Sequence, residues 1–261
     1  MAATPELEAR RTPGADVEAF GPGHWRLTIP PGPAGRYRWA QLDDYLRLPR
    51  SAFLWRPPLR LSLRARASRA ALPGTWGFGL WNDPFSAGLG LGGMARRLPA
   101  LPNAAWFFYA SPPNYLSLRD DLPAQGFLTA TFSSAAPAPL LALAAPALPL
   151  LAWPLAAGLL RRLGRHLVGE DSACLALDPT AWRGYRLDWD ADSIRFYVDG
   201  ELCFQTGVAP RAPLGLVLWI DNQYAALPPS GRLCFGTLAS PEPAWLELAD
   251  VAVDRPAPGS A

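Results

Sequence analysis

Two aspartates stand beside tryptophans where predicted strands end, and carboxyl groups in such places can do acid–base chemistry. Asp83 follows Trp81 and precedes Pro84, and Asp221 follows Trp219 by two residues. If the two met on one face of a sheet, one carboxylate could attack a sugar while the other protonated the leaving oxygen. Asp before Pro or Asn is also an ordinary strand terminator. Both interpretations stay open from the sequence.

Aromatic residues gather in the same stretches. Trp106 and Phe108 share one face of a predicted strand, and Phe107 and Tyr109 share the other. Such rings form a stacking surface for sugars or apolar small molecules, or they pack in the core. The residues expected to line a ligand site are Trp81, Asn82, Trp106, Tyr109, Trp219, Asn222 and Tyr224.

Alternating apolar and polar residues predict the strands that must position these side chains. The clearest case is a three-strand meander over 185–204, with a turn at 190–193 and a two-residue hairpin turn at Asp199-Gly200. A meander with one apolar face needs a second sheet to cover it, which predicts an all-β antiparallel β-sandwich. Further strands are expected near 25–29, 36–45, 59–67, 76–80, 106–109, 127–132, 214–220, 233–238 and 245–253.

Three motifs between residues 59 and 237 follow one another in a recognisable order. They are Leu61–Arg66 with Pro73–Trp76, the run Tyr185–Gly200, and the run Pro213–Asn222. Together they resemble glycoside hydrolase family 16, the laminarinase, lichenase and xyloglucan-transferase group of the concanavalin A-like lectin/glucanase superfamily. The resemblance implies a jelly roll of two curved sheets with a concave cleft. It also implies a Glu-x-Asp-x-Glu motif on the strand after the Gly-x-Trp strand.

That acidic motif is missing. The corresponding strand, 105–110, reads Ala-Trp-Phe-Phe-Tyr-Ala and contains no carboxylate. Hydrolysis needs a nucleophile or base and a proton donor, so this strand cannot supply the chemistry. The sequence therefore predicts a non-hydrolytic protein that binds a glycan or an apolar small molecule. The alternative is a glycoside hydrolase acting on a β-glucan-type polysaccharide, with relocated acids at Asp83 and Asp221.

Composition narrows the function further. The net charge of +2 gives no basic field for nucleic acid, and the arginines at 60, 64 and 66 are expected to form a solvated strand face. Three cysteines cannot all pair in disulfides, because one would remain unpaired, and two histidines cannot make a metal site by themselves. Neither a metal nor a cofactor is therefore expected. Unpaired cysteines are typical of a reducing compartment, which predicts a cytoplasmic protein.

The stretch 137–160 has no charged residue and is followed at once by Arg161, Arg162, Arg165 and His166. Its prolines argue against one regular helix. It is expected either to contact a membrane surface or protein partner through 137–166, at the inner membrane face, or to cap its own domain. The predicted organisation is an N-terminal arm over 1–35, a jelly-roll domain over 36–255 with the apolar insertion at 137–168, and a disordered tail over 256–261.

Overall fold

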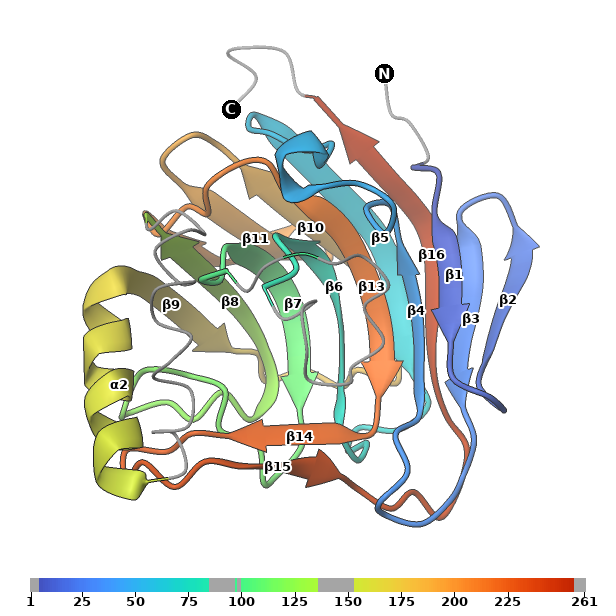
Figure 1. Cartoon of the computed structure of the whole chain (residues 1–261). Coiled ribbons are helices and arrows are strands. Elements are labelled where there is room, and N and C mark those ends of the chain that lie inside the picture. The colour runs from blue at the N-terminus through green and yellow to red at the C-terminus, as the bar shows by residue number, and fades with distance from the viewer. Residues whose placement is uncertain (1–4, 85–96, 98–99, 136–152, 256–261) are drawn as a thin grey trace.

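The computed structural model describes residues 5–84, 97, 100–135 and 153–255. Two seven-stranded antiparallel sheets stack face to face (Figure 1), and a two-stranded sheet lies beside them. The fold is therefore an antiparallel β-sandwich of the jelly-roll type, which confirms the predicted fold class.

We call the two large sheets sheet I and sheet II. In lateral order, sheet I consists of β1 (Glu8–Arg11), β4 (Trp39–Asp43), β13 (Gly215–Asp221), β6 (Thr75–Trp81), β7 (Ala104–Ala110), β8 (Gly126–Ser134) and β9 (Val168–Cys174). Sheet II consists of β12 (Glu201–Thr206), β11 (Ile194–Val198), β10 (Arg183–Trp189), β5 (Leu59–Ala67), β16 (Ala244–Asp254), β3 (His24–Ile29) and β2 (Asp16–Gly21). The small sheet pairs β14 (Gln223–Ala226) with β15 (Cys234–Thr237), and the helices are a 3₁₀ turn (Arg50–Ala52) and α2 (Pro154–Leu167).

The predicted meander is present in sheet II as β10, β11 and β12. Its hairpin turn is Asp199-Gly200, and both residues have positive φ, 51° and 87°. Glycine adopts this conformation without strain, and aspartate tolerates it better than most residues do. The turn therefore sets the register of the two strands.

The main core lies between the two sheets, where alternate residues of every long strand meet. Its largest fully buried side chains include Trp76, Phe78, Phe107, Trp189 and Phe196. A second apolar cluster covers the opposite, outer face of sheet I. Because both of its faces are covered, β13 is buried at all seven positions rather than at alternate ones.

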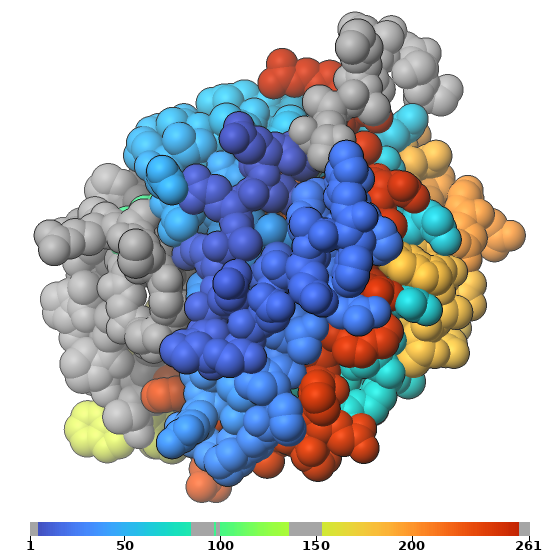
Figure 2. Space-filling view, turned by 90° about the vertical axis from the view of Figure 1, so that its right-hand side faces the viewer, coloured from blue at the N-terminus to red at the C-terminus, as the bar shows by residue number. Residues whose placement is uncertain are grey.

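The N-terminal segment contributes strands to both sheets, although the sequence suggested a separate arm. β1 pairs with β4 at the edge of sheet I, whereas β2 and β3 complete the far edge of sheet II. Figure 2 shows these blue strands in the middle of one side of the molecule. Their hydrogen bonds to β4 and β16 place residues 8–29 within the sandwich.

The second half of the expected apolar insertion forms α2, and the edge strand β9 begins at the last residue of that insertion. The helix begins at Pro154, where the missing N–H costs nothing in the first turn. Among the described residues, no helix is both long and apolar enough to cross a bilayer. The predictions for 137–152 and for the tail over 256–261 lie outside the described residues.

Candidate functional site

The outer face of sheet I carries the candidate site. On β7, alternation turns Ala104, Trp106 and Phe108 to this face and sends Phe107 and Tyr109 into the core. This is the strand on which the resemblance called for acids. Its outward positions instead hold a methyl group and two aromatic rings.

Trp106 is the centre of a ring cluster that we call the aromatic face, comprising Trp81, Trp106, Phe108, Phe132 and Trp219. The centroid of the Trp106 ring lies 5.6 Å from Trp219, 5.7 Å from Phe108, 5.9 Å from Trp81 and 6.0 Å from Phe132. These distances are typical of favourable aromatic pairs. The rings come from β6, β7, β8 and β13, so the lateral order of the sheet brings them together.

Two glycines on β6 make room for these rings. A Cβ on Gly77 would lie 2.8 Å from an atom of the Trp219 ring and 2.5 Å from the carbonyl oxygen of Phe107. A Cβ on Gly79 would lie 2.5 Å from the Cβ of Trp106. The alternating glycines therefore allow the indoles to lie directly on the sheet.

Three buried polar atoms on this face have no hydrogen-bond partner in the described parts of the chain. They are Nε1 of Trp81, Nε1 of Trp106 and Oγ of Ser172. Trp106 pairs with Ala130, and Ala130 pairs with Ser172, so the side chains of Trp106 and Ser172 lie in one row across three strands. Buried polar atoms usually have a partner, and hydroxyl groups of a ligand would supply one.

Asp221 ends β13 at the border of the aromatic face. Its Oδ1 accepts hydrogen bonds from Thr75 N at 3.2 Å, Thr75 Oγ1 at 3.0 Å and Gln223 N at 3.0 Å. Nε1 of Trp219 donates to the same Thr75 hydroxyl at 3.0 Å. Burial outweighs these hydrogen bonds and raises the pKa of Asp221 to about 7. At neutral pH this carboxyl can therefore both donate and accept a proton.

Asp83 has a different environment. It forms a buried ion pair with Arg97, whose guanidinium also donates to the carbonyl oxygens of Tyr45 and Leu48. Arg50 donates to the carbonyl oxygen of Asp83 at 2.6 Å. Burial raises the pKa of the Asp83 carboxyl, and the charge of Arg97 opposes that rise. These contacts make Asp83 an anchor for the chain that follows β6.

The register places the two predicted acids at opposite ends of sheet I. Thr75 pairs with Asp221, whereas Trp81, two residues before Asp83, pairs with Gly215 at the other end of β13. Six residues of extended strand span about 20 Å. Glycosidase carboxylates lie about 5–10 Å apart, so Asp83 and Asp221 do not meet as the relocated-acid hypothesis required.

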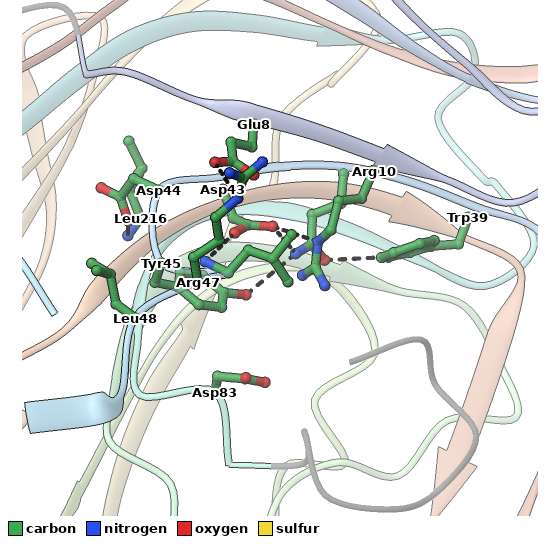
Figure 3. Close-up of polar contacts among 12 residues, drawn as sticks. Glu8, Arg10, Trp39, Asp43, Asp44, Tyr45, Arg47, Leu48, Asp83 and Leu216 are labelled. Carbon is green, nitrogen blue, oxygen red and sulfur yellow. Dashed lines mark hydrogen bonds and ion pairs between the residues drawn. The ribbon is translucent and has the colours of Figure 1, made fainter. Parts of the chain in front are cut away.

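The structure reveals a polar network beside the aromatic face that the sequence did not suggest (Figure 3). Oδ2 of Asp43 accepts from Arg10 Nε at 2.7 Å and from Gln41 Nε2 at 2.8 Å. Oε1 of Gln41 in turn accepts from Trp39 Nε1 at 3.2 Å. Arg10 belongs to the expected N-terminal arm, and only the pairing of β1 with β4 brings it to Asp43. For Trp39, Gln41 and Asp43, the alternation of residues within 36–45 was the one feature of the sequence that could have indicated that these side chains share a face.

Four of the predicted ligand residues lie away from the aromatic face. Tyr109 is in the core, stacked on Trp76 with centroids 5.6 Å apart. Asn82 is buried and joins the chain at 101–103 to the end of β6. Asn222 is fully buried and binds the backbone at residues 36, 38 and 238. Tyr224 lies on β14 in the small sheet, against Gly236. Trp81, Trp106 and Trp219 are brought together.

Fold and site together define a jelly-roll sandwich with a cluster of aromatic rings on the outer face of one sheet. No protein-family model matches the sequence, and no curated protein matches it. Among solved structures, the β-glucanase of Bacillus licheniformis is similar, with a TM-score of 0.47 and 10% identity over 95% of this chain and 92% of that chain.

The pseudo-β-1,3-glucanase of Mycobacterium tuberculosis, an immunostimulatory antigen, has a TM-score of 0.44 and 12% identity over 90% of this chain and 75% of its own. An endo-β-galactosidase of Clostridium perfringens has a TM-score of 0.44 and 12% identity over 91% of this chain and 53% of its own. At these identities and scores, the likeness says nothing about what this chain binds or cleaves.

Proposed function

We propose that the protein binds a glycan on its aromatic face without cleaving it. The observation that carries this proposal is the outer side of β7, which holds the partly buried Trp106 packed on the buried Phe108 and no acid. An indole stacks on the C–H faces of a sugar ring, because both surfaces are flat and apolar. An apolar small molecule is the other ligand class that such rings accept.

The polar atoms of the face favour the glycan. Trp106 Nε1 is a donor, and Ser172 Oγ is both a donor and an acceptor. They lie on strands two apart, which separates their Cα atoms by about 10 Å. A sugar unit stacked on Trp106 would bring hydroxyl groups to both atoms, whereas a hydrocarbon would leave them without partners.

The separation of Asp43 from Asp221 favours binding over hydrolysis by this pair. Asp43 is held by Arg10, and it pairs with Val217, four residues from Asp221 along β13. This spacing puts the Cα atoms of Asp43 and Asp221 about 14 Å apart. Retaining and inverting glycosidases need closer carboxyl groups.

Calorimetric titration with laminarin and with lichenan tests the proposal. Wild type should bind at least one of them, and Trp106→Ala should weaken that binding about tenfold. The matched control is Trp182→Ala, since Trp182 is a half-buried tryptophan over sheet II. This variant should bind as wild type does. Circular dichroism checks that each variant folds. If wild type binds neither glucan, or if Trp182→Ala weakens binding equally, the proposal is wrong.

A hydrolase that uses Asp221 with a partner other than Asp83 is the second candidate, because the pKa of Asp221 near 7 suits a general acid and its carboxyl accepts hydrogen bonds at the border of the aromatic face. A reducing-sugar assay on the same glucans separates the two functions. The binding proposal predicts no new reducing ends. Release of reducing ends by wild type, with loss in Asp221→Asn, would establish the hydrolase instead.

We place the protein in the cytoplasm, because its three cysteines are free thiols and suit a reducing compartment. Contact with the inner face of a membrane, or with a protein partner through 137–166, would use the surface around α2.

A further inference from the structure

Helix α2 is oriented opposite to an ordinary surface helix. Surface helices bury their leucines and expose their charges. In α2 the buried residues are Ala157 and Arg161, whereas a leucine row faces solvent. The row consists of Leu155, Leu159, Leu163 and Leu167, which are 92%, 58%, 50% and 53% exposed. Their spacing of four residues places them on one side of the helix.

The buried guanidinium of Arg161 fixes this orientation. Its nitrogens donate to the carbonyl oxygens of Leu227 at 2.9 Å, Arg119 at 2.8 Å and Ser117 at 3.2 Å. Another of its nitrogens donates to the carboxylate of Asp120 at 2.5 Å. Rotating the leucine row inward would break all four bonds and leave the carbonyl oxygens of Leu227, Ser117 and Arg119 without this donor. The row therefore cannot turn toward the domain.

The loop after β14 clamps the beginning of the helix. Gly231 lies so close to the first turn that a Cβ there would be 1.9 Å from the carbonyl oxygen of Pro154 and 2.7 Å from the amide nitrogen of Gly158. The backbone of the loop thus fills the space on the buried side of α2. Contacts at the first turn and in the middle of the helix therefore hold α2 along the side of the molecule (Figure 1), with the leucine row exposed.

The charge around the leucine row indicates what covers it. The helix contains no acidic residue, and Arg162, Arg165 and His166 are exposed at its C-terminal half. Arg165 pairs with Asp120, and Arg162 has no ion pair within the described residues. Trp153, just before the helix, is 71% exposed. Leucines on one side, cations beside them and a tryptophan at the end are the pattern of a helix that lies in a bilayer interface.

We propose that α2 is a membrane-surface anchor, which lays its leucine row among the lipids of an anionic bilayer. Its 14 residues span about 21 Å along the helix axis, so it lies in the plane of the surface. Arg162 and Arg165 contact the phosphate and carboxylate groups of the headgroups. A second copy of the chain would bring cations against cations at this face, which disfavours a dimer.

Co-sedimentation of the full chain with phosphatidylcholine vesicles, with and without phosphatidylserine, tests the anchor. Wild type should bind the phosphatidylserine vesicles more strongly, and added salt should weaken that binding. Leu159→Asp should lower the vesicle partition coefficient about tenfold, because it puts a charge where the leucine side chain would be buried among the lipids. Arg162→Glu should lower it for the anionic vesicles alone.

Leu202→Asp is the matched control, since Leu202 is 52% exposed on β12 at the far edge of sheet II. It should bind vesicles as wild type does. If wild type does not sediment with anionic vesicles, or if Leu202→Asp lowers binding as much as Leu159→Asp, the proposal is overturned. A wild-type dimer in light scattering that Leu159→Asp converts to a monomer, without vesicle binding, would assign the row to a second copy.

Discussion

The outer faces of the two sheets differ in what their strands present. On sheet II, Arg60 of β5 pairs with Asp188 at 2.7 Å, and Arg66 pairs with Glu247 at 2.5 Å. On sheet I, the same alternation presents Trp106 and Trp219. One face consists mainly of charged pairs, with Trp182 and Trp245 packed on Arg66, and the other is a layer of rings bordered by the Arg10–Asp43 pair.

This difference indicates which of the two sheets carries the ligand site. Partly exposed ion pairs are in equilibrium with water and need no further partner, so the arginine row of sheet II is the solvated face that its sequence predicts. The aromatic layer of sheet I is largely buried, and its unpartnered polar atoms gain free energy when a ligand hydroxyl reaches them. A ligand site is therefore expected on sheet I, and sheet II supplies the controls.

The largest expected effect concerns Asp221 on sheet I. Its pKa of about 7 exceeds the value near 4 of an unfolded chain, so the folded protein retains a proton that the unfolded chain has lost. The free energy of unfolding should therefore fall as pH rises from about 4 to about 7, by up to about 4 kcal/mol. Urea unfolding at several pH values measures this fall.

Asp221→Asn keeps an oxygen for Thr75 and Gln223 and cannot ionise, so it should remove that part of the pH dependence. Asp44, whose pKa burial raises to about 6, is unchanged in both proteins and cancels in the difference. Identical pH profiles for wild type and Asp221→Asn would contradict the buried, protonated carboxyl.

A glycine exchange compares the two faces directly. Gly77→Ala on sheet I should destabilise the protein by about 2–3 kcal/mol, because its Cβ would overlap the carbonyl oxygen of Phe107 and the Trp219 ring. Gly184→Ala on β10 of sheet II meets only an Asp199 oxygen, at 3.8 Å, and should change stability by less than about 0.5 kcal/mol. Urea unfolding compares them, and equal effects would mean that Trp219 does not lie over Gly77.

The smallest expected effect is at Glu247 on sheet II. Burial disfavours its ionised form, but hydrogen bonds from Arg66 and Arg26 outweigh burial and lower its pKa. Its contribution to the free energy of unfolding is therefore present above about pH 4.5 and is lost as pH falls through the lowered pKa. This pH dependence has the opposite sign to that of Asp221. Glu247→Gln should cost about 1 kcal/mol at pH 7 and less at pH 3. Equal costs at both pH values in urea unfolding would disprove the ion pair.

Much of the strand pattern could be predicted, and the exceptions have local causes. The meander and β5 alternate strictly, so their periodicity is visible. β1 has only four residues, including Arg10 and Arg11, and its edge position leaves little apolar signal. β9 contains Glu170 and Asp171 and has little apolar alternation, so no strand was predicted over 168–174.

The candidate site could be predicted only in part. Alternation showed that Trp106 and Phe108 share a face, but it could not tell which face points outward, so Tyr109 was grouped with them. Asp83 and Asp221 both follow tryptophans, yet antiparallel pairing of β6 and β13 sends the two strand ends in opposite directions. The direction in which two strands pair therefore decides whether the residues at their ends lie close together.

By itself, the sequence determined the inventory of side chains and their alternation along each strand, because both are properties of a few neighbouring residues. Tertiary structure alone decided that Trp219 lies on Gly77, that Arg10 reaches Asp43, and that α2 buries an arginine. These contacts join segments far apart in the chain. They depend on which strands pair and which surfaces the whole molecule buries, and no local pattern encodes either.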